Sequence, residues 1–302
     1  MTSAENDQSP RDSRVAVVGG GAIGGFTAAQ LSSAGWPVTV CVRTPFDQLV
    51  LDTPNGRVHA DVEISADPAT QQLADWVLVT TKAQDTAGAA AWLARLTGPN
   101  TVVVLLQNGV DHAERVAGLV DAGTVLPALV YAPVERVAPG HMVWHAAGRF
   151  VVPTGQQATR FSELFAGTDV EVDVTDDFRT AAWRKLLSNI AANPLTALTL
   201  RRMDMMREPD VRALATTLMR EAVAVARADG ADVDDQDVQR IFTMWDSFDP
   251  GGGSSMLYDR LAGRPLEHEY LTGAVVAYAE RHGVDVPLNR AMLTLLRALA
   301  SS

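Results

Sequence analysis

Three polar side chains recur at four-residue intervals in an otherwise apolar segment. The segment is WRKLLSNIAANPLTAL, residues 183–198, and it carries Lys185, Asn189 and Asn193. Residues four apart lie above one another on a helix, so the ammonium and the two carboxamides would share one stripe. An ammonium can protonate a developing alkoxide, and carboxamides can orient substrate oxygens. The spacing therefore indicates a polar site on a helix, although the solvated stripe of an amphipathic helix would give the same pattern.

A glycine-rich turn upstream of this stripe has the spacing of a dinucleotide site. Gly19, Gly21 and Gly24 form G-x-G-x-x-G between a β-branched strand and an alanine-rich helix. The first glycine permits a tight turn, the second lets the backbone approach a pyrophosphate, and the third lets the helix pack on the strand. The alternative is a glycine turn that binds nothing. The predicted cofactor-binding residues of the turn are Gly19, Gly20, Gly21, Ala22, Ile23 and Gly24.

The residue at the end of the second strand indicates which dinucleotide binds. An NAD site usually has Asp or Glu about 20 residues after the glycines. This chain has Arg43 there. A guanidinium suits the extra phosphate of NADP, so we expect NADPH, with a surface arginine at the sheet edge as the alternative.

Two further loops follow strands whose carboxyl ends should face the same crevice, where open α/β sheets bind ligands. One carries Lys82 and the other Asn108. Lys82 could hold a substrate carboxylate or a cofactor phosphate. Asn108 could form hydrogen bonds near the nicotinamide, although Gln-Asn-Gly is also an ordinary turn.

The elements that must position these residues predict two domains. Strands at 76–81 and 101–106, a helix at 85–96, and antiparallel pieces around Pro139-Gly140 indicate an α/β domain. After Asp176 the pattern becomes helical, with long helices at 210–230 and 266–283 and a flexible loop at 249–256. We therefore expect a disordered tail at 1–13, a doubly wound Rossmann-type domain at 14–175 and an all-α domain at 176–302.

Composition limits the classes of partner. The 302 residues carry a net charge of −11, which argues against nucleic acid or an anionic membrane as a partner. Cys41 is the only cysteine, so no intrachain disulfide and no cysteine-based metal cluster can form. His268 lies between Glu267 and Glu269, but adjacent positions do not share a helix face, so we expect no metal site. Without an apolar signal or membrane span, the sequence predicts a cytoplasmic protein.

Together these motifs resemble the ketopantoate reductase (2-dehydropantoate 2-reductase) family over nearly the whole chain. The resemblance runs through VAVVGGGAIGG, VLVTTKAQDT, VVVLLQNGV, WRKLLSNIAANPLTAL, SSMLYDRLAGRPLEHEYLTGAVV and VPLN, in that order. It implies a Rossmann domain plus a helical domain of the 6-phosphogluconate-dehydrogenase-like kind. It also implies NADPH as cofactor and reduction of 2-ketopantoate to pantoate, in pantothenate and coenzyme A biosynthesis.

The resemblance also implies roles for single residues. Lys185 looks like the catalytic lysine, and Glu267 looks like the acidic residue that supports it. The remaining correspondences are Asn189 and Asn193 as substrate contacts, Ser255 as the ligand of the substrate carboxylate, Lys82 and Asn108 as residues of the crevice, and Arg43 as the cofactor-phosphate arginine.

The chain departs from the family pattern at three places. The usual Glu-Ile-Asp is Glu267-His268-Glu269, the usual Asn-Gly is Thr272-Gly273, and the loop before Ser255 is a triple glycine, Gly251–Gly253. These departures bear on the substrate more than on the chemistry, and they leave open the NADPH-dependent reduction of a different 2-oxo acid or related carbonyl substrate. A catalytically inactive NADPH-binding sensor is a separate alternative. The apolar helical domain also leaves room for a homodimer.

Overall fold

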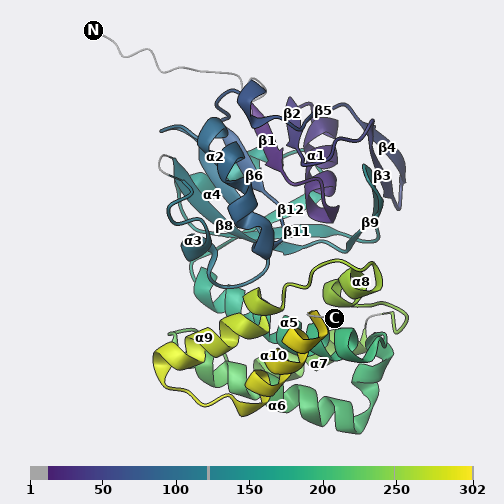
Figure 1. Cartoon of the computed structure of the whole chain (residues 1–302), viewed down its shortest axis with the longest axis vertical. Coiled ribbons are helices and arrows are strands. Elements are labelled where there is room, and N and C mark those ends of the chain that lie inside the picture. Colours follow the sequence, from purple (N-terminus) through teal and green to yellow (C-terminus); the bar gives the residue numbers. More distant parts are fainter. Residues whose placement is uncertain (1–12, 121–122, 248, 301–302) are drawn as a thin grey trace. The chain divides into compact units, whose positions relative to one another are not determined.

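The computed structural model describes residues 13–120, 123–247 and 249–300, which form two compact units (Figure 1). As far as they are described, residues 1–107 and 112–176 form the first unit, and residues 108–111 and 177–302 the second. Residues 1–12 of the predicted tail lie outside the described residues. The short segment Asn108–Asp111 therefore groups with the helical unit, although it follows a strand of the first unit.

The first unit is built on an eight-stranded sheet. From edge to edge its strands are β12 (Val170–Thr175), β11 (Gly148–Pro153), β8 (Thr124–Tyr131), β7 (Val102–Leu106), β6 (Trp76–Val79), β1 (Val15–Val18), β2 (Val38–Cys41) and β5 (Glu63–Ser65). The strands from β8 to β5 are parallel, and β11 pairs antiparallel with β8. In chain order, the six parallel strands read 3-2-1-4-5-6 from β5, which confirms the predicted doubly wound Rossmann-type domain.

Short helices connect these strands. They are α1 (Ala22–Ser33), η2 (Pro68–Thr70), η3 (Ala83–Ala89), α2 (Ala90–Leu96), α3 (His112–Arg115) and α4 (Gln156–Leu164). The single helix expected at 85–96 is divided, because its first half, η3, is a 3₁₀-helix. That half contains Thr86 and Gly88, which have low α-helix propensity.

A second sheet of four strands belongs to the same unit. Its order is β4 (Gly56–Ala60), β3 (Leu49–Thr53), β10 (His141–Trp144) and β9 (Val134–Ala138). The antiparallel pieces expected around Pro139-Gly140 are confirmed as the β9–β10 hairpin. Gly140 has φ +71° in its turn, a conformation that favours glycine. Strands β3 and β4 were not expected from the sequence.

The second unit is helical, as predicted. Its elements are α5 (Phe178–Thr199), η4 (Met203–Arg207), α6 (Pro209–Ala228), α7 (Asp235–Asp246), α8 (Ser255–Leu261), η5 (His268–Tyr270), α9 (Thr272–His282) and α10 (Pro287–Ala300). The helix expected at 266–283 is shorter, because η5 precedes α9. The expected loop at 249–256 ends at Ser254, where α8 is capped.

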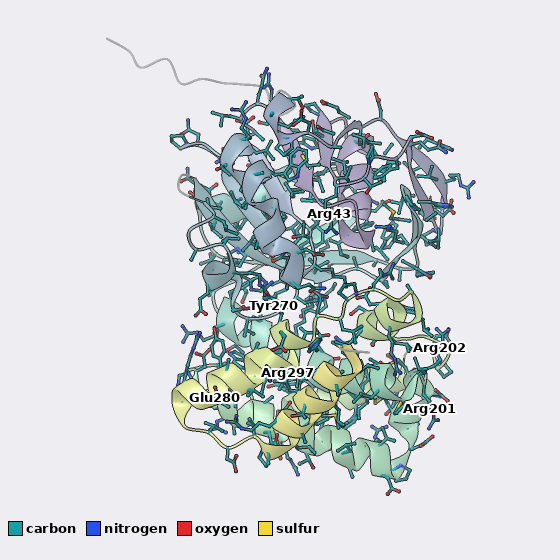
Figure 2. All side chains as sticks on the ribbon, viewed as in Figure 1. Arg43, Arg201, Arg202, Tyr270, Glu280 and Arg297 are labelled. Carbon is teal, nitrogen blue, oxygen red and sulfur yellow. The ribbon has the colours of Figure 1, made fainter. Side chains whose placement is uncertain are left out.

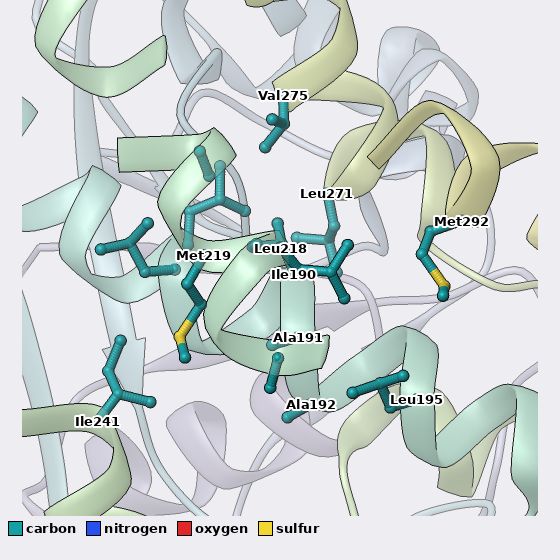
Figure 3. Packing of buried hydrophobic residues seen from close by; sticks show 14 of the residues in the cluster. Ile190, Ala191, Ala192, Leu195, Leu218, Met219, Ile241, Leu271, Val275 and Met292 are labelled. Atoms are coloured by element: carbon teal, nitrogen blue, oxygen red, sulfur yellow. The ribbon is translucent and has the colours of Figure 1, made fainter. Parts of the chain in front are cut away.

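Helix α5 lies in the core of this unit, which explains its apolar sequence. Figure 3 shows Ile190 and Leu195 of α5 among buried residues that include Leu218 of α6, Val275 of α9 and Met292 of α10. Pro194 does not end α5, which continues to Thr199. The proline lacks the N–H that would bond the carbonyl of Ile190, so tertiary packing must stabilise the helix there. Among the described residues, no helix is both long and apolar enough to span a membrane, and the cytoplasmic location stays a prediction.

Candidate functional site

The glycine turn lies between β1 and α1, as its spacing predicts. Gly19 has φ +117°, and its N–H donates to the carbonyl of Cys41 at 2.9 Å. A Cβ on Gly24 would lie 1.8 Å from the carbonyl oxygen of Gly19, so only glycine permits this contact of helix and turn. A Cβ on Gly21 would meet nothing within 4 Å. The backbone is therefore open at the one glycine that should let a pyrophosphate approach.

Thr80, at the end of β6, fixes this turn and was not predicted. Its hydroxyl lies 3.1 Å from the carbonyl oxygen of Val18 and 2.9 Å from that of Gly19. Gly19 itself leaves no space, because a Cβ there would stand 2.9 Å from the N–H of Thr81. The threonine is one of many β-branched residues at strand ends, so the sequence held no signal that singled it out.

A pocket of about 490 Å³ surrounds the turn within the first unit. Its wall includes Gly19, Gly20 and Gly21, together with the predicted Arg43 and Lys82. The Arg43 side chain, labelled in Figure 2, is 86% exposed, and its Nη1 lies 4.0 Å from Oδ1 of Asp85. An ion pair this long and exposed contributes little, which leaves the guanidinium able to bind an anion.

In the second unit, Lys185 forms the centre of a polar group. Its Nζ donates a hydrogen bond of 2.8 Å to Oδ1 of Asn108, 77 residues away. Burial lowers the pKa of the lysine from 10.5 to about 8, and the negative charge of Glu267 opposes this shift. Glu267 is itself 4% exposed. The structure thus brings together three of the predicted residues, and a lysine with such a pKa can give up a proton near neutral pH.

The two asparagines of the stripe differ in depth. Asn189 is half-buried, whereas Asn193 is 3% exposed. The Nδ2 of Asn193 has no hydrogen-bond partner among the described residues. A buried amide N–H without a partner costs roughly 1–3 kcal/mol, so it indicates a group that a ligand would satisfy.

Ser255 and its neighbour Ser254 lie in different environments. Ser255 is exposed at the start of α8. Ser254 is the buried one: its Oγ accepts from the N–H of Leu257 at 3.1 Å and lies 2.7 Å from Oγ1 of Thr196. This hydroxyl pair joins the N-terminus of α8 to helix α5, one turn beyond Asn193. Sequence reasoning missed Ser254, because adjacent serines give no signal of which one caps the helix.

The departures from the family pattern have local structural roles. Glu269 forms a two-point ion pair with Arg297, at 2.6 and 2.8 Å, and lies 3.5 Å from His268. In the triple-glycine loop, the N–H of Gly253 donates to the hydroxyl of Tyr258 at 3.0 Å. A Cβ on this glycine would stand 3.2 Å from the Tyr258 ring, so the close contact restricts the position to small residues. No three acidic, histidine or cysteine side chains in the described ranges are grouped as metal ligands.

Comparison with known proteins covers almost the whole chain. Residues 15–157 match the family model described as ketopantoate reductase PanE/ApbA, and residues 177–300 match its C-terminal counterpart. The chain is 40% identical to a 2-dehydropantoate 2-reductase from Caulobacter vibrioides, covering 95% of this chain and 99% of the relative. It is 37% identical to one from Mycobacterium tuberculosis, covering 94% and 97%. The crystal structure of a PanE/ApbA family ketopantoate reductase from Ralstonia eutropha JMP134 matches with a TM-score of 0.89 and 32% identity, over 95% and 98% of the two chains.

Proposed function

Because this chain belongs to the ketopantoate reductase family, we propose that it reduces 2-ketopantoate (2-dehydropantoate) to pantoate with NADPH. The proposal rests above all on Lys185, whose desolvated ammonium is bonded to Asn108 and electrostatically coupled to Glu267. In this group, Lys185 is the proton donor, the carboxamide oxygen of Asn108 orients it, and the carboxylate of Glu267 favours its charged form. A helix face that served only solubility would not need this arrangement.

The first unit fits a nicotinamide dinucleotide. The N-terminus of α1 has no side-chain cap and no acidic residue in its first turn, so its backbone N–H groups can bind pyrophosphate oxygens. Gly21 is open to that approach. Arg43 and Lys82 supply positive charge in the same pocket, which supports NADPH rather than NADH. Arg43 replaces the acidic residue that would accept from the ribose hydroxyls of NAD.

The chemistry needs a hydride and a proton. When bound, the nicotinamide supplies the hydride to the ketone carbon of the substrate. Negative charge develops on the ketone oxygen, and Lys185 Nζ donates a proton to it as general acid. Asn108 orients the lysine through its 2.8 Å hydrogen bond, and the charge of Glu267 favours the protonated form before each turnover.

The remaining polar residues hold the substrate. Asn193 donates its unsatisfied N–H to a substrate oxygen, and Asn189 provides a second carboxamide on the same stripe. Ser255 binds the carboxylate from the exposed start of α8. In this way, every group that contacts the substrate is fixed by a helix or a helix terminus, which limits the entropy lost on binding.

Initial rates of NADPH loss test this proposal. The purified chain is assayed against ketopantoate and a panel of other 2-oxo acids, each with NADPH and with NADH. We expect ketopantoate to be reduced with the highest kcat/KM, and NADPH to be preferred. Good rates with another 2-oxo acid, and none with ketopantoate, would overturn the substrate and retain the reaction class. NADPH binding without turnover on any acid would instead support the sensor. The homodimer that the sequence allows stays a separate prediction, which sedimentation velocity can test.

A further inference from the structure

A third cation lines the pocket around the glycine turn. Arg136 belongs to β9 of the four-stranded sheet, yet it is part of the same wall as Arg43 and Lys82. It follows Lys82 by 54 residues and lies in none of the motifs that indicated a nucleotide site.

Packing against the glycine turn fixes the β9–β10 hairpin. A Cβ on Gly140, in the turn of the hairpin, would stand 2.6 Å from the ring of Phe46, and a Cβ on Gly20 would stand 3.1 Å from the same ring. Phe46 therefore packs between the two turns. On β10, the Cε of Met142 lies 1.8 Å from where a Cβ of Gly25 would be, so the strand also packs directly on helix α1. The hairpin is thus a wall of the pocket and does not merely lie near it.

The charge of Arg136 is not neutralised within the described part of the chain. The side chain is exposed, and it has neither a hydrogen bond nor an ion pair with any described residue. Arg43, by contrast, has Asp85 at 4.0 Å. Side chains alternate along a strand, so the carboxylate of the preceding residue, Glu135, lies on the other face of β9, where it is 3.8 Å from Nε2 of His145. The pocket therefore holds two guanidiniums and an ammonium against one carboxylate.

We propose that Arg136 is a further phosphate-binding residue, which acts with Arg43 on the 2′-phosphate of the nucleotide and strengthens the preference for NADPH over NADH. A phosphate monoester carries nearly two negative charges and accepts paired N–H donors from guanidinium groups. The single positive charge of Arg43 matches only part of that negative charge. This inference rests on the NADPH proposed above as cofactor.

Calorimetric titration with adenosine 2′,5′-bisphosphate and with AMP tests the inference without any turnover. The two probes differ by the 2′-phosphate alone. We expect Arg136→Met to weaken binding of the bisphosphate about tenfold, as for the loss of one charged hydrogen-bonded contact. Binding of AMP should change less than about twofold. Arg136→Lys retains the charge and loses the paired donors, so its affinity for the bisphosphate should lie between those of the wild-type protein and Arg136→Met.

Arg57→Met is the matched control, because it removes one positive charge from β4 of the same sheet and does not line this pocket. This variant should bind the bisphosphate and AMP with affinities within about twofold of those of the wild-type protein. Unchanged binding of the bisphosphate to Arg136→Met, or equal weakening of both probes, would overturn the inference. A chain that reduces no 2-oxo acid but loses bisphosphate affinity through Arg136 would refute the proposed activity and retain this site. If the chain reduces ketopantoate but its bisphosphate affinity does not depend on Arg136, the proposed activity stands and this site is refuted.

Discussion

The pH dependence of turnover tests the role of Lys185 most directly. Its pKa is lowered to about 8, chiefly because burial disfavours the ammonium. A general acid must be protonated, so kcat/KM for reduction should be constant below this pKa and fall above it. The lysine is about 90% protonated at pH 7 and about 10% at pH 9. The rate constant should therefore decrease roughly tenfold over that interval, whereas a lysine with its ordinary pKa of 10.5 would give a flat profile.

Removing the charge of Glu267 should shift the pH profile in a known direction. Its negative charge raises the pKa of Lys185, so Glu267→Gln should lower that pKa and move the descending limb to more acidic pH. Glu269→Gln is the control: it removes the same charge two residues away, from a half-exposed carboxylate that is paired with Arg297. In Glu269→Gln, kcat/KM should begin to fall at the same pH as in the wild-type enzyme.

The assay is the initial rate of NADPH loss at low ketopantoate concentration, from pH 6 to pH 10 as the chosen range. A wild-type profile that stays flat to the highest pH would refute a lysine with a lowered pKa as the proton donor. A limb that moves to more alkaline pH in Glu267→Gln would refute the electrostatic role of the carboxylate. A shift of equal size in Glu269→Gln would show that general surface charge, and not the buried contact, sets the profile.

Four further substitutions test separate parts of the site. Lys185→Ala should lower kcat by roughly 10²–10⁴ and leave the Kd of NADPH, measured by calorimetry, unchanged. Asn193→Ala should raise KM roughly tenfold while the free energy of unfolding changes by less than about 1 kcal/mol, because the lost N–H is unsatisfied in the free protein. Gly24→Ala should destabilise the protein by roughly 2 kcal/mol or more in urea unfolding, through its clash with Gly19. Gly21→Ala, which has open space, should keep its stability and weaken NADPH binding instead.

The elements that could be predicted are those whose backbone conformation is determined by a few neighbouring residues. The strand, turn and helix around Gly19 were predictable because β-branched runs, glycines at fixed spacing and an alanine-rich stretch each restrict the backbone on their own. The β9–β10 hairpin was predictable from Pro139-Gly140 for the same reason. The 3₁₀ geometry of η3 was not, since the alanines around Gly88 are compatible with either helix type.

Contacts between segments that are distant in the sequence could not be predicted from local patterns. Asn108 follows strand β7, and its role beside the nicotinamide stays a prediction. Its hydrogen bond with Lys185, within the helical unit, could not be predicted from that position. Thr80 and Ser254 have structural roles that depend on a carbonyl and a hydroxyl contributed by other elements. No spacing within either segment encodes such a partner, because the partner is 58 or more residues away.

The stripe on α5 shows why spacing and depth carry different information. A four-residue interval places Lys185, Asn189 and Asn193 on one face whatever surrounds the helix. It does not say how far each side chain is buried, and that depth sets the chemistry. Desolvation is what lowers the lysine pKa to about 8, and enclosure is what leaves the Nδ2 of Asn193 without a hydrogen-bond partner among the described residues. The same three residues on a solvated helix would be an ordinary lysine and two ordinary amides, so the helical core packed around α5 is as much a part of the proposed site as the side chains themselves.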